Sequence, residues 1–189
     1  MLYDYVWKII VGGQGGAGKT TLLHRYIHDV FIEDMGMTIG VQMHTSNLIR
    51  QNKKISLVMW DLGGQERFRF IQGDYMRGAS AAMVFFDMTH HEGFPQVQEW
   101  VELIRKNTFS KIPIILIGTK LDLVTDLTRS NEIHERAARY SELLDLVCYT
   151  PTSSKWGINV YETMNFIVDL LIWDAFLSES AARVPQVQY

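Results

Sequence analysis

The sequence is poor in features that would point to a secreted or nucleic-acid-binding protein. Its 189 residues include one cysteine, Cys148, so no intramolecular disulfide can form. Cys148 lies in a short apolar run without an electropositive neighbour, which favours a buried structural side chain over a reactive thiol. The formal net charge is −3, whereas nucleic-acid-binding domains usually carry a basic face. We therefore expect no nucleic-acid partner.

Long hydrophobic segments are also lacking. A membrane-spanning helix needs about 20 apolar residues. The longest apolar runs are residues 112–117 and residues 166–177, and Asp169 and Asp174 interrupt the second. The N-terminus has no signal-peptide pattern, and the six histidines show no metal-ligand spacing. We expect a cytoplasmic protein that associates with membranes only peripherally, through partners.

Short apolar runs alternate with stretches of helical period, which predicts an α/β domain with a mostly parallel sheet and helices on both faces. We predict a single domain over residues 1–177 and a polar, flexible tail over residues 178–189. A turn at residues 51–53 indicates a hairpin that adds one antiparallel edge strand. The predicted strands are residues 5–11, 41–46, 55–60, 81–86, 112–117 and 146–149. The predicted helices are residues 18–27, 94–106, 130–143 and 159–177.

A glycine-rich loop joins the first predicted strand to the first predicted helix. Residues 13–20 read Gly-Gln-Gly-Gly-Ala-Gly-Lys-Thr, the pattern of a phosphate-binding loop in its expected context. The glycines allow successive backbone N–H groups to converge on phosphate oxygens, and the helix that follows directs its positive end at the same anion. Lys19 can reach the β- and γ-phosphates, and the Thr20 hydroxyl is a hard oxygen ligand for Mg²⁺. This loop predicts phosphate binding but does not separate kinases, ATPases and GTPases.

The second informative segment follows the strand at residues 55–60 and reads Trp-Asp-Leu-Gly-Gly-Gln-Glu. A carboxylate at Asp61 can hold Mg²⁺, usually through water. The Gly64 N–H can contact a γ-phosphate, and Gln65 can orient an attacking water. The segment therefore predicts triphosphate hydrolysis.

Two further segments indicate which base is bound. Asp122, in the sequence Gly-Thr-Lys-Leu-Asp, can accept two hydrogen bonds from the N1–H and amine of guanine, whereas adenine has no such donor pair on that edge. The Lys120 stem can lie across the purine. Backbone amides of residues 152–155, Thr-Ser-Ser-Lys, could bind the guanine carbonyl. Each segment is weak alone, but their order behind a phosphate loop predicts a guanine nucleotide.

These motifs, together with Thr-Ile-Gly-Val at residues 38–41, resemble those of the small GTPases of the Ras superfamily. The Gln-Glu-Arg-Phe-Arg stretch at residues 65–69 is most similar to the Rab branch. The resemblance implies the P-loop NTPase fold with a six-stranded sheet, a first switch at residues 32–39 and a second at residues 62–75. It also implies that Phe31 packs edge-on to the purine, although Phe31 could instead be a core residue that ends the first helix.

The chain departs from the family pattern in four places. Gly63 stands where Rab and Ras proteins usually have Ala, and the resulting Gly-Gly pair is similar to the Arf branch and Gα subunits. Thr119 replaces the commoner Asn, and Ser154 replaces the usual Ala. The last residues contain no cysteine, and Leu2 stands in place of the glycine required for myristoylation, so we expect no lipid anchor on this chain.

The expected function is hydrolysis of GTP to GDP and phosphate by a molecular switch in signalling or vesicle trafficking. Because residues 31–38 contain no Arg, we expect slow turnover that an activating protein accelerates, with effectors and an exchange factor as further partners. The alternatives are another P-loop enzyme, such as an ATPase or nucleotide kinase, and a module that binds nucleotide without switching. The predicted catalytic residues are Gln65 and Lys19, and the predicted Mg²⁺ ligands are Thr20, Thr38 and Asp61. The predicted nucleotide-binding residues are Gly13, Gly15, Gly16, Ala17, Gly18, Lys19, Thr20, Thr21, Phe31, Thr38, Gly64, Thr119, Lys120, Asp122, Ser153, Ser154 and Lys155.

Overall fold

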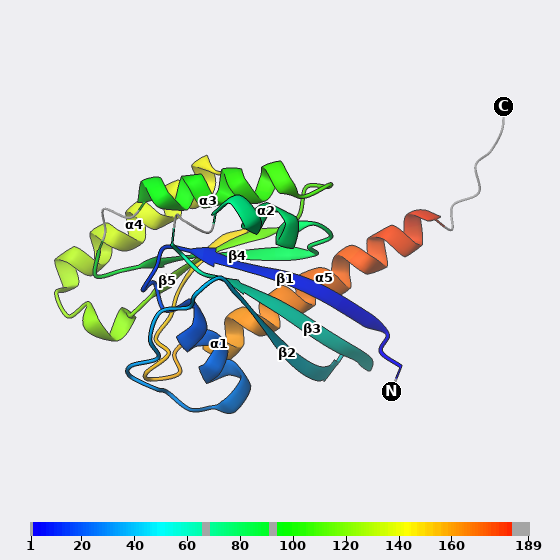
Figure 1. Ribbon diagram of the computed structural model, residues 1–189, viewed down its shortest axis with the longest axis horizontal. Helices are drawn as coiled ribbons and strands as arrows, with labels where there is room; N and C mark the ends of the chain where they lie inside the picture. The colour runs from blue at the N-terminus through cyan, green and yellow to red at the C-terminus, as the bar shows by residue number, and fades with distance from the viewer. Residues whose placement is uncertain (1, 66–68, 91–93, 183–189) are drawn as a thin grey trace.

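A six-stranded sheet in the order β2-β3-β1-β4-β5-β6 forms the centre of the computed structural model, which describes residues 2–65, 69–90 and 94–182 (Figure 1). Neighbouring strands are parallel except β2 and β3, which are antiparallel. The predicted fold, a mostly parallel sheet with one antiparallel edge strand, is confirmed. The strands are β1 (Tyr5–Gly13), β2 (Val41–Arg50), β3 (Lys53–Leu62), β4 (Ala81–Asp87), β5 (Ile114–Thr119) and β6 (Cys148–Pro151).

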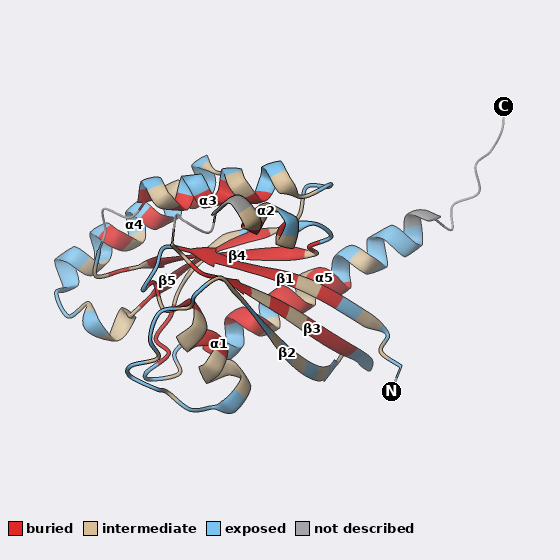
Figure 2. Ribbon diagram, viewed as in Figure 1, coloured by how far each residue is buried: buried red, intermediate tan, exposed pale blue. Residues whose placement is uncertain are grey.

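Helices cover both faces of the sheet (Figure 1). Helices α1 (Lys19–His28) and α5 (Val160–Ala182) pack on one face, where they bury side chains with Ile9 and Val11 of β1. Ile10, which lies between those two residues in the strand, belongs to the core on the opposite face. The helices of that face are α2 (Arg69–Met76), α3 (Phe94–Asn107) and α4 (Leu127–Leu143). Figure 2 shows the resulting buried layers on either side of the central strands.

The hairpin predicted from the turn residues is also present. Gln51 and Asn52 connect β2 to β3 with φ angles of 49° and 60°, the left-handed conformation that two-residue hairpin turns require. The ladder extends from Arg50 opposite Lys53 to Val41 opposite Leu62. It therefore ends directly beside the segments that form the candidate site.

Several element boundaries differ from the predictions for identifiable reasons. Strand β5 begins at Ile114 rather than residue 112, because Pro113 has no N–H to donate; its carbonyl instead accepts from the Ala82 N–H at 2.9 Å. Helix α4 begins at Leu127 because the Asp126 carboxylate caps it by accepting from two backbone N–H groups. Strand β6 lies two residues later than predicted, and helix α2 was not predicted.

Helix α5 continues to Ala182, five residues beyond the predicted end. Residues 178–182, assigned from sequence to a flexible tail, are therefore helical, and residues 183–189 lie outside the described part of the chain. The last turns of α5 extend past the sheet (Figure 1). Within residues 2–65, 69–90 and 94–182, no helix is long and apolar enough to cross a membrane.

Candidate functional site

The glycine-rich loop lies where β1 ends at Gly13 and α1 begins at Lys19. Gly13, Gly16 and Gly18 have φ angles of 140°, 76° and 76°, which side chains rarely adopt. A Cβ on Gly13 would also overlap the backbone of Phe85 in the neighbouring strand β4. The loop is therefore held in a shape that only these glycines permit.

Lys19 is 5% exposed, and its ammonium is held by the loop itself. Its Nζ donates to the carbonyl oxygens of Gly13 and Gln14, both at 2.9 Å. Burial lowers the pKa of Lys19 to about 8, and the nearby Asp61 carboxylate opposes this shift. A desolvated ammonium on neutral carbonyls is well suited to pair with a phosphate oxygen.

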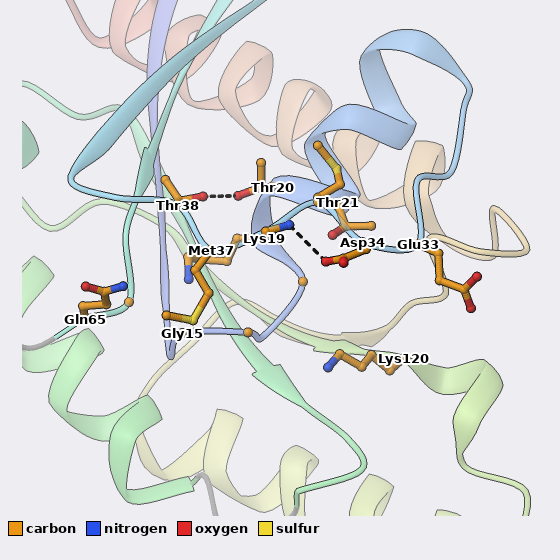
Figure 3. A pocket seen from close by; sticks show the side chains of 15 residues that line it. Gly15, Lys19, Thr20, Thr21, Glu33, Asp34, Met37, Thr38, Gln65 and Lys120 are labelled. Atoms are coloured by element: carbon orange, nitrogen blue, oxygen red, sulfur yellow. Dashed lines mark hydrogen bonds between the residues drawn. The ribbon is translucent and has the colours of Figure 1, made fainter.

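Three oxygen-bearing side chains from different elements converge next to Lys19. The Thr20 Oγ1 of α1 lies 2.6 Å from the Thr38 Oγ1, and these two side chains face each other in Figure 3. The Thr20 hydroxyl donates to the Asp61 carboxylate, and the Thr38 Oγ1 lies 3.5 Å from the same Oδ2 atom.

Asp61 is completely buried at the end of β3. Burial raises its pKa, while the bond from Thr20 and the charge of Lys19 act in the opposite direction. Its Oδ1 atom is buried and has no hydrogen-bond partner among the described residues. Two hydroxyls and a carboxylate with a spare oxygen form the hard-oxygen set that Mg²⁺ prefers, so these residues fit the predicted ion.

Two adjacent cavities lie over these residues, with volumes of about 290 and 220 Å³. They share four lining residues and therefore form one elongated groove. Among the predicted residues, the first cavity is lined by Gly15, Gly16, Gly18, Lys19, Thr20, Thr21, Thr38, Gly64, Gln65 and Lys120. The second is lined by Gly18, Thr21, Phe31, Thr119, Lys120, Asp122, Ser154 and Lys155. Gly13, Ala17, Asp61 and Ser153 are buried and line neither cavity.

Asp122 lies in the second cavity, and Ser153 holds it in place. The Ser153 hydroxyl donates to Asp122 Oδ1 at 2.6 Å and accepts from the Trp156 N–H at 3.2 Å. Ser153 has no exposed surface, so its side chain supports the carboxylate from behind. Phe31 lines the same cavity rather than the core, as expected for a residue packed against a purine.

Thr119 and Lys120 connect this cavity to the rest of the site. The Thr119 hydroxyl lies 2.8 Å from the Ala17 carbonyl oxygen in the phosphate loop, and so joins the two loops directly. Lys120 has a φ angle of 60°, and its Nζ lies 2.7 Å from Asp87 Oδ2. Burial raises the pKa of Asp87, but the bonds from Lys120 and Thr89 outweigh it, and the net shift is downward.

The Asp87–Lys120 ion pair was not predicted, because nothing in the sequence around residue 87 marks it as a partner of the loop after β5. The sequence also predicted the first switch only as a segment. The individual residues of that segment that line the first cavity, besides Thr38, are Glu33, Asp34, Met35, Gly36 and Met37.

The second switch begins against the phosphate loop. A Cβ on Gly64 would overlap the backbone of Gln14 and Gly15, so the two loops are in direct contact. Gln65 follows and lines the first cavity (Figure 3). Residues 66–68 of the predicted second switch lie outside the described residues.

Comparisons with known proteins show which proteins the chain resembles. A family model described as the Ras family matches residues 8–172. The chain is 34% identical to the Ras-related protein Rab-3C of Mus musculus over 169 residues, which cover 89% of this chain and 73% of that protein. It is 32% identical to human Ras-related protein Rab-3A over 169 residues, which cover 89% of this chain and 75% of that protein. It is 35% identical to the GTP-binding protein ypt3 of Schizosaccharomyces pombe over 166 residues, which cover 88% of this chain and 76% of that protein.

Proposed function

The chain belongs to the Ras family of small GTPases, and from that membership we propose which residues carry out each part of its cycle. As a family member closest to the Rab branch, it binds GTP, hydrolyses it to GDP and phosphate, and acts as a nucleotide-dependent switch. Its similarity to Rab proteins supports a role in vesicle trafficking. We propose that the protein acts in the cytoplasm.

The nucleotide lies along the two joined cavities, with its phosphates in the first and guanine in the second. The observation that carries this proposal is the position of Asp122, whose carboxylate lines the second cavity and is fixed by Ser153. A fixed carboxylate can accept hydrogen bonds from both guanine donors, N1–H and the amine. Phe31 and the Lys120 stem line the same cavity and provide apolar contact with the purine.

The phosphates lie at the amino end of α1, where the backbone N–H groups of the loop and the helix dipole attract negative charge. Thr20, Thr38 and Asp61 would hold Mg²⁺, Asp61 through water. The ion would supply positive charge to the β- and γ-phosphate oxygens. Lys19 adds a second positive charge to the same oxygens.

Hydrolysis begins when a water oxygen attacks the γ-phosphorus. The attack is in line with the bond from the γ-phosphorus to the β–γ bridging oxygen, and this bond breaks. The water protons end on the released phosphate and in solvent, and the electron pair of the broken bond remains on GDP. Gln65 orients the water and the Gly64 N–H contacts a γ-phosphate oxygen. An activating protein supplies the arginine that residues 31–38 lack, for an acceleration of about 10³–10⁵-fold.

Chromatography of the nucleotide released from the purified protein tests the proposal first. Guanine nucleotide is expected, whereas adenine nucleotide would favour the ATPase or nucleotide-kinase alternative. Added GTP should then be converted slowly to GDP by the wild type and more slowly by Gln65→Leu, with GDP affinity retained. A protein that holds GTP without turnover, even with prolonged incubation, would be a binding module instead.

A further inference from the structure

Gly63 brings the two switches into backbone contact. Its N–H donates to the Gly40 carbonyl at 2.8 Å, which continues the β2–β3 ladder beyond its last pair. A Cβ at Gly63 would lie 2.7 Å from the Thr38 carbonyl oxygen and 2.9 Å from that of Gly40. Both are backbone atoms and cannot turn away as the end of a long side chain can. The first switch therefore lies this close only because residue 63 has no side chain.

Helix α2 fixes the other side of the same peptide. The Gln72 Nε2 donates to the Gly63 carbonyl at 2.7 Å, and Gln72 has no exposed surface. Burying an amide is costly unless it is hydrogen-bonded. The Gln72 Oε1 has no partner among the described residues, so the bond to Gly63 is the one that compensates for burial. Gly63 is thus held between Gly40, which directly follows the first switch, and Gln72 of α2.

Thr38 links this contact to the nucleotide. Its carbonyl faces Gly63, and its hydroxyl lies 2.6 Å from that of Thr20 in the metal-binding set. A side chain at residue 63 would have to displace the Thr38 carbonyl by several tenths of an ångström. The Thr38 hydroxyl, two bonds from the same Cα, would move with it.

We propose that Gly63 and Gln72 are positioning residues that set the preference for GTP over GDP by holding Thr38 at the phosphate end of the groove. The inference rests on the proposed function, because it needs Thr38 to act where the γ-phosphate lies. GDP lacks the γ-phosphate, so a displaced Thr38 weakens GTP binding more than GDP binding. A purely structural role would instead lower thermal stability and weaken both nucleotides equally.

Gly63→Ala is the direct test, and Gly73→Ala is its matched control. Gly73 lies in α2 next to Gln72, and the three atoms nearest to a Cβ there all belong to the end of the Asn107 side chain. Affinities for GDP and for the imido analogue of GTP are measured with Mg²⁺ by displacement of a fluorescent GDP. We expect Gly63→Ala to lose about tenfold in its preference for the GTP analogue, the lower end of the range for one lost hydrogen bond to a charged group. The preference of Gly73→Ala should stay within about twofold of the wild type, as expected for a site outside the network.

Gln72→Met keeps the side-chain volume, removes the donor to Gly63, and covers the case in which Gly63→Ala does not fold. We expect a shift of about threefold in the same direction, since the bond it removes acts on Thr38 indirectly. In a Thr38→Ala background, Gly63→Ala should have no further effect on the preference, because both changes act through one residue.

A wild-type preference in folded Gly63→Ala or Gln72→Met would overturn the inference, and so would equal weakening of both nucleotides. The inference would also be overturned if the effects of Gly63→Ala and Thr38→Ala on the nucleotide preference were fully additive in the double variant. None of these outcomes affects the proposed function, which fails if the wild type does not bind guanine nucleotides selectively or does not hydrolyse GTP.

Discussion

Replacing Asp122 with Asn should change the base that the protein prefers. The carboxylate lines the second cavity, with the Ser153 hydroxyl donating to Oδ1 at 2.6 Å. Guanine presents two donors at this position, and a carboxylate accepts from both. An amide of the same shape offers one acceptor and one donor, so one guanine donor faces the N–H of the new amide. Because the Ser153 hydroxyl can donate or accept, the shape of the loop should survive the change.

The size of the effect follows from the hydrogen bonds that are lost. A hydrogen bond to a charged group is worth about 1.5–3 kcal/mol, so the loss of one corresponds to a decrease of about 10–10²-fold in GTP affinity. Xanthine carries a carbonyl where guanine carries the amine. The amide introduced by Asp122→Asn could donate to that carbonyl, so xanthosine triphosphate should bind the variant about 10²-fold more tightly than it binds the wild type.

Competition of GTP and xanthosine triphosphate against a fluorescent GDP measures both affinities. Asp126→Asn is a suitable control, because Asp126 also accepts hydrogen bonds through its carboxylate but caps α4 and does not line the second cavity. Its base preference should match that of the wild type. If Asp122→Asn still prefers GTP over xanthosine triphosphate, the placement of guanine against Asp122 is wrong.

Three further outcomes are expected. Gly15→Val should slow GTP hydrolysis about tenfold while GDP affinity changes little, because a Cβ there lies 4.0 Å from Gly64 and the valine methyls would extend toward Gln65; unchanged single-turnover rates would contradict this. The folded-state pKa of Asp87 is lowered, so its stabilising effect is present above the unfolded value near 3.8 and is lost as pH falls below it. Asp87→Asn should therefore cost about 1–2 kcal/mol in urea unfolding at pH 7 and progressively less as the pH falls below 3.8, and a cost independent of pH would rule out the ion pair with Lys120 as its cause. Chelation of Mg²⁺ should accelerate release of fluorescent GDP from the wild type, and a chelator-independent rate would exclude the ion from the site.

The sequence predicted most of the fold and the phosphate loop because their signals are local. The glycines before Lys19 and Thr20 are the residues that give that loop its shape, so their spacing can be read directly from the sequence. The apolar runs likewise mark strands that are covered on both faces. Asp122 and Gln65 could be proposed from sequence because each lies in a short motif just after a strand.

Features that depend on strand register or on helix propensity were harder to predict from the sequence. Asp87 meets Lys120 only because parallel pairing sets Asp87 opposite Thr119. Helix α5 extends beyond the last apolar residues that predicted it, because residues 178–182 contain no Gly or Pro that would end the helix. The sequence marked Gly63 as a departure from the family pattern, but only the structure shows how little room the residue has.

A crystal structure of the complex with Mg²⁺ and the imido analogue of GTP tests the placement of the nucleotide most directly. We predict guanine in the second cavity with N1 and the amine on Asp122, and the γ-phosphate between Lys19 and the Gly64 N–H. Mg²⁺ should contact the hydroxyls of Thr20 and Thr38. A purine outside the second cavity, or triphosphate away from residues 13–20, would contradict the account.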